Sequence, residues 1–533
     1  MRLLTCLLPA ALAATAVALP VQAADPTPQP GGTVRIYQRD NPASASILEE
    51  ATYSTNVPFM SVYNNLIRYK QDVPQNSDAS IEPELATSWN WGPDGKSITF
   101  KLRDGVTWHD GKPFTARDVK CTWDLIQDKA PEKLRKNPRK LLWNNVQEVV
   151  PNGDTEVTFK LARRQPSLLA LFASGYSAVY PCHATPAQQR TKPIGTGPFK
   201  LAEFKQNEMI RLVKNTDYWN KGKPYLDSIE MPIMTSRATA MLAFQAHKLD
   251  MTFPLEVTPP ILRDIKKEVP TAVCAWGPMN VNTNLIVNRE KPPFDNPEIR
   301  KAMALALDRK AFVDILYEGK AGIGGALLPR PDGVWGMPDD MKKTMLGYDP
   351  DVAKNREEAR AIMKKLGYGP DNHLKVKVST RNIPAYRDPA VILIDHLKEI
   401  WIDGELDPMD TPVWFAKLAR KDYAVGLNLT GNSLDDPDQT FFENFACASE
   451  RNYSQYCNPA LEKEFDAQSQ ETDVEKRKTM VWAIDQQIQN DVARPVILHS
   501  EGGTCWWPQV HGFTQMVNSS YNGYRFENLW IEH

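Results

Sequence analysis

Alternating hydrophobic and polar residues predict half-buried strands in the first half of the chain. Residues 98–102 and 157–161 place apolar side chains at every second position, and residues 33–37 repeat the pattern. This spacing is typical of antiparallel strands with one face on a core and one in solvent. We therefore expect a small α+β unit, from about residue 81 to 192, that contains the first two strands.

The densest turn chemistry lies in residues 103–119. Two Asp-Gly pairs bracket a short apolar stretch, and Thr115 stands three residues before Asp118 as in a variant of the capping box. The pattern predicts a hairpin, a tight turn and a helix. His109 lies beside an aspartate, but a surface imidazole next to a turn is a simpler interpretation than a reactive pair.

The second half of the chain shows helical spacing behind polar caps. Helix starts are predicted at Asn296, Asp308, Asn355, Asp388, Asn458 and Asp473. These helices alternate with apolar stretches at 374–379 and 423–429, and residues 521–530 return to a strand-like pattern. The alternation is the βαβ rhythm of an α/β fold with a parallel-type sheet.

The N-terminus has the pattern of a cleaved signal peptide, residues 1–23. Arg2 precedes an apolar, alanine-rich run, and small residues lead up to Ala23. A membrane anchor is the alternative, but prolines interrupt the run and it is short for a span of roughly 20 residues. Cys6 lies at the start of the run rather than beside the cleavage site, so we do not expect a lipoprotein. The mature protein should lie outside the cytoplasm.

Charge and cysteine usage narrow the function further. With 63 Lys and Arg against 65 Asp and Glu, the net charge of −2 gives no reason to expect nucleic acid as a partner. Six cysteines follow the signal peptide, an even number that suggests disulfides in an oxidising compartment. Cys447 and Cys457 are the likeliest pair by sequence, but six cysteines allow 15 pairings. No CxxC is present, so we expect neither a zinc site nor another cofactor.

Several separated segments together resemble the extracytoplasmic solute-binding proteins of ABC importers, family 5, which include the dipeptide- and oligopeptide-binding proteins. The matching segments are residues 106–119, 194–201, 215–229, 293–302, 436–438 with Cys447 and Cys457, and 524–529. They follow the family's order and span almost all of the mature chain.

The resemblance implies an α/β, two-lobed periplasmic-binding-protein fold, type II-like, with a hinge of crossing strands. Lobe I would comprise residues 31–275 and 504–533, with an extra subdomain at about 81–192, and lobe II residues 278–501. Cys274 and Cys505 would then lie beside the hinge and pair, and Cys121 and Cys182 could pair within the subdomain.

The same resemblance implies a periplasmic receptor that encloses a small ligand between its lobes and passes it to the permease of an ABC importer. We expect a monomer that catalyses no reaction. Closure would follow from ligand contacts to both lobes.

The ligand is less certain because the chain departs from the peptide-binding pattern. Peptide-binding members hold the peptide's amino terminus with an acid just before the motif matched by residues 436–438. Here Asn432 or Ser433 takes that place, and Asp435 could substitute only if the loop shifts. A buried ammonium without a carboxylate is costly. We expect a peptide or peptide-like ligand, with an opine, a modified amino acid or an oligosaccharide as alternatives.

Further candidate ligand contacts come from both predicted lobes. Thr430 and Gly431 belong to the same loop as Asn432, and either Arg381 or Arg387 could hold a carboxylate through a bidentate pair. Candidates for the remaining wall are Tyr53, Tyr63, Asn64 and Trp414, with Phe415 beside it; a core role for Trp414 is an equally good interpretation.

A secreted hydrolase is the alternative from another class. The chain has neither Gly-x-Ser-x-Gly nor His-Glu-x-x-His. His499, Ser500 and Glu501 are consecutive, but neighbours on a strand point to opposite faces.

Overall fold

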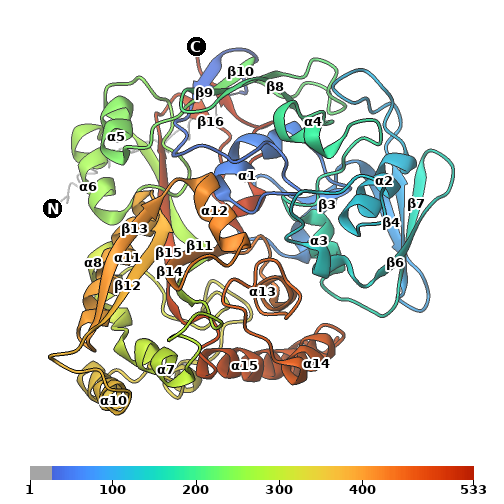
Figure 1. The fold of residues 1–533 in the computed structure, drawn as a ribbon. Helices are drawn as coiled ribbons and strands as arrows, with labels where there is room; N and C mark the ends of the chain where they lie inside the picture. Colours follow the sequence, from blue (N-terminus) through green and yellow to red (C-terminus); the bar gives the residue numbers. More distant parts are fainter. Residues whose placement is uncertain (1–26) are drawn as a thin grey trace, which may run out of the picture.

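The computed structural model describes residues 27–533 and shows the two-lobed α/β architecture expected from the resemblance (Figure 1). The predicted signal peptide and Cys6 lie outside the described residues. We call lobe I the part built on the sheet β1-β10-β9-β8 with its attached subdomain, and lobe II the part built on the sheet β13-β12-β14-β11-β15. The residue limits given above for the lobes stay a prediction.

Lobe I is built on a four-stranded mixed sheet. Its strands, in sheet order, are β1 (Thr33–Arg35), β10 (Ser228–Pro232), β9 (Met209–Lys214) and β8 (Phe199–Lys205), and only the β1–β10 pair is parallel. Around it lie α1 (Tyr53–Phe59), η1 (Met60–Val62), β2 (Ile67–Tyr69), η2 (Asp78–Ser80), β3 (Ile81–Pro83), α5 (Arg237–Gln245) and α6 (Pro259–Glu268).

The attached subdomain carries an antiparallel sheet at the right of Figure 1. Its strands, in sheet order, are β4 (Ala86–Trp91), β5 (Ser97–Leu102), β7 (Glu156–Leu161) and β6 (Val146–Pro151). Its helices are α2 (Ala116–Ile126), η3 (Lys140–Trp143), α3 (Leu168–Ala173) and α4 (Pro186–Thr191). The predicted strands at 98–102 and 157–161 pair directly with each other as β5 and β7.

Lobe II is built on a five-stranded sheet in which β12, β13 and β14 run parallel. Its strands are β13 (Ile402–Met409), β12 (Leu374–Arg381), β14 (Val425–Gly431), β11 (Val273–Val287) and β15 (Val496–Trp506). Its helices are α7 (Pro297–Ala306), α8 (Arg309–Tyr317), α9 (Asp339–Lys342), α10 (Val352–Lys365), α11 (Pro384–Lys398), α12 (Thr411–Ala419), α13 (Pro437–Asn444), α14 (Pro459–Gln468) and α15 (Val474–Asn490).

The long antiparallel strands β11 and β15 connect the two lobes. One end of the pair belongs to the lobe II sheet, and at the other end β15 bridges to lobe I at Met251 and Val257. After β15 the chain returns to lobe I through β16 (Val510–His511), η4 (Ser520–Asn522) and β17 (Trp530–Ile531). The pair therefore has the position of a hinge.

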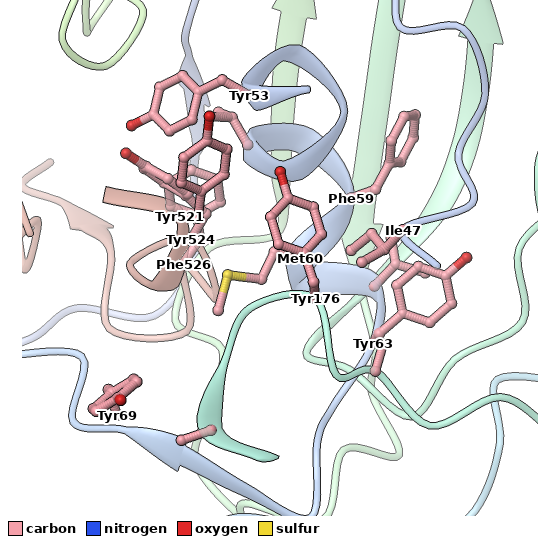
Figure 2. Close-up of a cluster of buried hydrophobic side chains, with 14 of the residues drawn as sticks. Ile47, Tyr53, Phe59, Met60, Tyr63, Tyr69, Tyr176, Tyr521, Tyr524 and Phe526 are labelled. Carbon is pink, nitrogen blue, oxygen red and sulfur yellow. The ribbon is translucent and has the colours of Figure 1, made fainter. Parts of the chain in front are cut away.

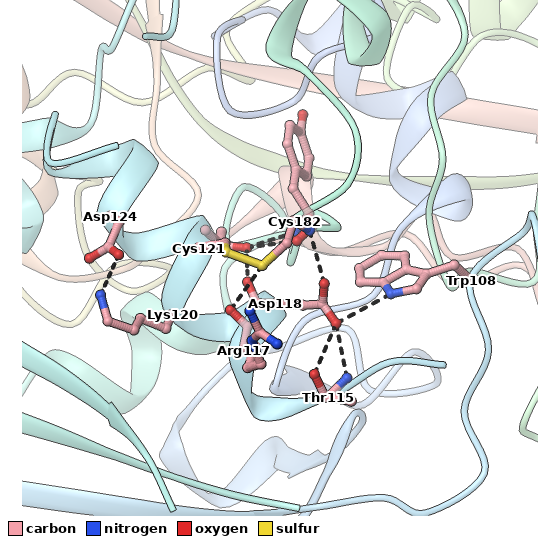
Figure 3. The surroundings of a disulfide bond; sticks show 10 residues. Trp108, Thr115, Arg117, Asp118, Lys120, Cys121, Asp124 and Cys182 are labelled. Carbon is pink, nitrogen blue, oxygen red and sulfur yellow. Dashed lines mark hydrogen bonds and ion pairs between the residues drawn. A yellow bond between two sulfur atoms is a disulfide. The ribbon is translucent and has the colours of Figure 1, made fainter. Parts of the chain in front are cut away.

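Three disulfide bonds join the cysteines in the pairs expected above. Cys274 and Cys505 face each other on β11 and β15, and Cys447 and Cys457 close a short loop after α13. Cys121 on α2 is bonded to Cys182, as Figure 3 shows.

The run at residues 103–119 has a structural role. Thr115 and Asp118 form the capping box of α2, and the Asp118 carboxylate also accepts from the Cys182 backbone N–H at 2.9 Å (Figure 3). His109 contacts the Gly197 carbonyl at 3.0 Å. Residues 106–108 and 112–114 form the predicted hairpin around a tight turn, since the Trp108 N–H donates to the Lys112 carbonyl at 2.8 Å and the Phe114 N–H to the Val106 carbonyl at 2.9 Å. The pairing amounts to a single bridge, Thr107 to Pro113, and not to a regular strand.

Two other helix starts and one strand differ from the prediction. α10 begins three residues before Asn355, which lies inside the helix and donates to the Asp349 carbonyl at 2.9 Å. α11 begins at Pro384, so Pro389 is an interior residue. Residues 521–529 form η4 and loop rather than a strand, and β17 begins only at Trp530. The Ser520 and Asn522 side chains hold η4 by donating to backbone carbonyls of other segments.

Neither a membrane span nor a metal centre is found in the described part. From residue 27 to 533, no helix is long and apolar enough to cross a membrane, and no three His, Cys, Asp or Glu side chains gather as metal ligands would.

Candidate functional site

A cavity of about 230 Å³ lies between the lobes. Its lining includes aromatic rings from both lobes: Tyr53, Tyr317, Tyr386, Phe415, Tyr453 and Tyr521. Its charged lining side chains are Arg39, Arg237, Arg381, Arg451, Glu256, Asp388 and Glu501. An enclosed space with apolar rings and a few charged groups is typical of a small-molecule site.

The lobe I wall is rigid because its aromatic residues pack edge to face. Tyr53 begins α1, where the Thr52 side chain caps the helix by accepting from the Thr55 N–H at 3.1 Å. The Tyr53 ring lies 5.1 Å from that of Tyr521 and 5.4 Å from that of Tyr524 (Figure 2). This cluster joins the first helix of lobe I to the returning C-terminal segment.

A carboxylate shared by two arginines borders the same wall. Glu256 forms an ion pair with Arg39 and a second with Arg237 at 3.3 Å. Burial by itself would raise the pKa of Glu256, but the two guanidinium groups hold it below its ordinary value. Asp388, which also lines the cavity, lies close enough to Arg237 to act on its charge. The positive and negative groups here therefore balance.

Arg381 connects the lobes across the cavity edge. It is 1% exposed and pairs with Asp40 of lobe I, and it donates to the Ser54 hydroxyl at 2.9 Å. Its guanidinium carbon lies 5.2 Å from the ring centroid of Tyr386 and 5.8 Å from that of Phe415. Burial opposes the charge of Asp40, but Arg381 lowers the pKa of that carboxyl.

The sequence model of a protein family, the bacterial extracellular solute-binding proteins, family 5, matches residues 80–452. The chain belongs to this family. It is a family 5 solute-binding protein.

Curated relatives of this solute-binding protein include several peptide-binding proteins and the heme-binding protein A of Haemophilus influenzae, which is 26% identical and covers 88% of this chain and 87% of the relative. The solute-binding protein is 27% identical to the oligopeptide-binding protein OppA of Bacillus subtilis over 437 residues, covering 76% of this chain and 77% of the relative. It is 26% identical to the dipeptide-binding protein of Escherichia coli, covering 88% and 89%.

Solved structures confirm the fold. DppA of Helicobacter pylori, in complex with the peptide STSA, superposes with a TM-score of 0.82 at 21% identity, covering 95% of this chain and 99% of that one. AgaA of A. tumefaciens R10, in complex with agropinic acid, gives 0.82 at 23% identity, covering 94% and 99%.

Four of the ligand contacts proposed from the sequence line the cavity of the solute-binding protein: Tyr53, Arg381, Phe415 and Gly431. Gly431 ends β14 where the chain passes closest to lobe I. A Cβ at this position would lie 1.9 Å from the Tyr521 hydroxyl oxygen. A side chain at position 431 would therefore require the Tyr521 ring to move.

Thr430 of β14 and the residues of the loop after it, Asn432 and Ser433, do not line the cavity. Thr430 accepts from the Asn284 amide at 2.9 Å, and the Ser433 hydroxyl lies 2.7 Å from that of Ser174 in lobe I. The Asn432 backbone N–H donates to the Asn280 carbonyl at 3.0 Å, and its side chain is buried outside the lining. These residues hold the loop against its neighbours.

Asp435 does not line the cavity, and its carboxylate joins a segment of lobe II to a segment of lobe I. Its carboxylate accepts from the Val334 N–H at 3.1 Å in lobe II and from the Asn518 amide at 3.4 Å in lobe I. Burial raises its pKa to about 6. Asp435 is therefore not placed to replace the missing amine-binding acid.

Four other candidates lie outside the lining. Tyr63 stacks on Tyr180 at 5.1 Å, and Asn64 donates to Glu84 at 2.7 Å, both in the core of lobe I. Arg387 is exposed, and Trp414 is fully buried in a lobe II core cluster. Phe415, one residue on, lines the cavity instead.

Several lining residues were not found from the sequence. Tyr386 lies in the first turn of α11, Arg451 in a turn and Tyr521 in η4, and their distance from the hinge cannot be read from periodicity. The one usable signal was for Arg451, because it falls inside the short loop that Cys447 and Cys457 close.

Proposed function

We propose that this protein captures a short peptide or peptide-like solute in the cavity between its lobes. It then delivers the solute from the periplasm to the permease of an ABC importer, acting as a monomer and without catalysis. The observation that carries the proposal is the cavity of about 230 Å³, whose lining comes from both lobes and from the hinge strands.

The lining explains why solute and closure depend on each other. Tyr53 and Tyr521 come from lobe I, whereas Tyr386 and Tyr453 come from lobe II. A solute that touches both sets binds the closed form better than the open form and shifts the population toward closure. The permease can then distinguish the loaded protein by its shape.

The size of the cavity favours a short solute. The family relationship to dipeptide- and oligopeptide-binding proteins supports a peptide or a peptide-like compound. A long peptide would require an open channel or a larger space.

An opine-like conjugate is a second candidate, favoured by one observation. The carboxylate that would neutralise a peptide's amino terminus is absent from the β14 loop, where Asn432 and Ser433 stand outside the cavity. Structures with the same fold include AgaA with agropinic acid and MoaA with mannopinic acid.

A solute screen tests the proposal. The exported protein is stripped of bound solute by partial unfolding, refolded and titrated with dipeptides, tripeptides, opines and oligosaccharides while its melting temperature is measured. Mass spectrometry identifies any solute released during stripping. We expect stabilisation by peptides or opines and none by oligosaccharides. Stabilisation by oligosaccharides alone, or by no class with no solute released, would overturn the proposal.

Export is tested separately at the N-terminus. Cleavage after Ala23 predicts that the protein recovered from the periplasm begins at Ala24. N-terminal sequencing that finds Met1 would contradict export by cleavage.

A further inference from the structure

One end of the cavity carries positive charge that the protein itself does not balance. Arg451 lines this end, is 6% exposed and pairs with Glu443 through one nitrogen. Its Nε is buried and has no hydrogen-bond acceptor. Glu443 is not reserved for Arg451, because Arg139 lies 3.7 Å from its other oxygen.

A second arginine, Arg494, packs against Tyr453 of the cavity lining. The guanidinium carbon of Arg494 is 5.0 Å from the ring centroid of Tyr453, which lines the cavity. Arg494 is 2% exposed and donates only to the Asn444 side chain, at 3.0 Å, leaving Nε and one Nη buried without acceptors. Within residues 27–533, no carboxylate lies within ion-pair distance of it.

Lys421 adds to the positive charge at this end. Its ammonium lies 5.4 Å from the Tyr453 ring centroid and donates to the Asn452 carbonyl at 2.7 Å. Burial lowers the pKa of Lys421 to about 8 and that of Arg494 to about 10. Glu443 pairs with Arg451 and also lies near Arg139. Glu49 and Glu50 are buried beside Arg451 and Tyr453 as well, but their ion pairs are with Arg190, Arg135 and Lys136. Glu450 is exposed, and Glu290 acts on Lys421.

The other arginines of the lining are matched by acids. Glu256 and Asp388 balance Arg39 and Arg237, and Asp40 balances Arg381. A buried cation without a counter-ion is costly, and buried polar groups are ordinarily hydrogen-bonded. An anionic group of a bound solute would therefore be stabilised most at the end of the cavity formed by Arg451 and Tyr453.

We propose that Arg451, backed by Arg494, forms an anion subsite that takes a carboxylate or another oxyanion group of the solute. This inference rests on the proposed capture of a peptide-like solute and narrows it to solutes with an acidic group at the Tyr453 end. A planar oxyanion matches the unpartnered N–H of a guanidinium, which is always charged and donates in a fixed geometry.

Matched solutes that differ only in one charge test the subsite. The stripped, exported protein is titrated by calorimetry with Ala-Glu and Ala-Gln, and with N-(1-carboxyethyl)glutamate and N-(1-carboxyethyl)glutamine. We expect the acidic member of the better-binding pair to bind at least tenfold more tightly. In Arg451→Gln this preference should vanish, whereas Arg451→Lys should retain part of it.

Arg289→Gln is the matched control. Arg289 also lies over a tyrosine of lobe II, 5.1 Å from the ring centroid of Tyr456, but outside the cavity between the lobes. It should keep the full preference. Melting temperatures of all variants, measured without solute, show whether each is folded.

Equal affinity for both members of each pair in the wild type would overturn the subsite, as would an equal loss for both in Arg451→Gln. If neither pair binds, the melting temperatures of the wild type and of Arg451→Gln are compared in malonate and in chloride at equal ionic strength. A higher melting temperature in malonate for the wild type but not for Arg451→Gln supports the subsite, and the same response in both overturns it. Binding of a neutral solute with no effect of Arg451→Gln would leave solute capture standing and refute only the subsite.

Discussion

At the scale of single residues, Gly431 at the end of β14 lies directly against the Tyr521 side chain of lobe I. Gly431→Ala would place a Cβ 1.9 Å from the Tyr521 hydroxyl oxygen, so the ring must leave its position or the lobes must separate. We expect the variant to bind the solute found by the screen at least tenfold more weakly, measured by calorimetry. Gly369→Ala, where nothing lies within 4 Å of the added atom, is the control and should bind normally.

Asp435 gives a pH-dependent prediction at the same scale. Its folded pKa of about 6 lies above the ordinary value of 3.8 because of burial. Between these values the folded protein holds a proton that the unfolded chain releases, so the contribution of Asp435 to stability falls as pH rises from about 4 to about 6.

Asp435→Asn keeps an acceptor for Val334 and Asn518 but removes the titration. Relative to the wild type, it should gain about 1–2 kcal/mol between pH 4 and pH 6.5, measured by denaturant unfolding. Asp371→Asn, at an exposed position, should show no such trend. A difference between Asp435→Asn and the wild type that stays constant with pH would contradict this assignment.

The sequence identified Tyr53, Arg381, Phe415 and Gly431 as cavity residues but not the chemistry of the β14 loop. The alignment of Asn432 with the amine-binding acid says which residue is missing, whereas the direction of its side chain depends on the backbone bond to Asn280, 152 positions away in the chain. Long-range contacts of this kind leave no local pattern in a single sequence.

At the scale of elements, the loop closed by Cys447 and Cys457 presents Arg451 and Tyr453 to the cavity. Replacing both cysteines by serine should lower stability by about 3 kcal/mol or less, since the loop is short, and should also weaken solute binding because the loop loses its restraint. The matched variant without Cys121 and Cys182 should lose stability and keep its affinity. Solute titration and thermal unfolding of both variants check this prediction. Equal solute affinities in the two variants would contradict it.

Elements with strong local signals were predicted and those fixed by tertiary contacts were not. The Thr115 capping box and the Asn296 cap start α2 and α7 where expected. α11 instead begins at Pro384, because the chain leaves β12 immediately before it and the backbone is already turned. Residues 521–530 alternate like a strand, but the Ser520 side chain donates to the Met279 carbonyl on β11 and the Asn522 side chain to the Ser433 carbonyl, which holds the start of the segment as η4.

At the scale of the whole molecule, a pair of long strands joins two separately packed lobes around one cavity. Separate buried clusters form the cores of lobe I and lobe II, and the β11–β15 pair passes between them with a disulfide beside the crossing. Because the two cores are separate, each lobe can move as a rigid body, and the cavity between them then changes shape more than either lobe does. The resemblance of ordered motifs was enough to predict this architecture, because the motifs mark the family rather than the solute.

Filling the cavity tests the central claim most directly. Ala385 lines it, and Ala385→Trp would occupy the space without removing a bonded group. Ala460→Trp, at an exposed position on α14, is the control. Calorimetric titration with the solute found by the screen should show at least a hundredfold loss of affinity in Ala385→Trp and none in Ala460→Trp. Wild-type affinity in Ala385→Trp would show that the solute binds elsewhere.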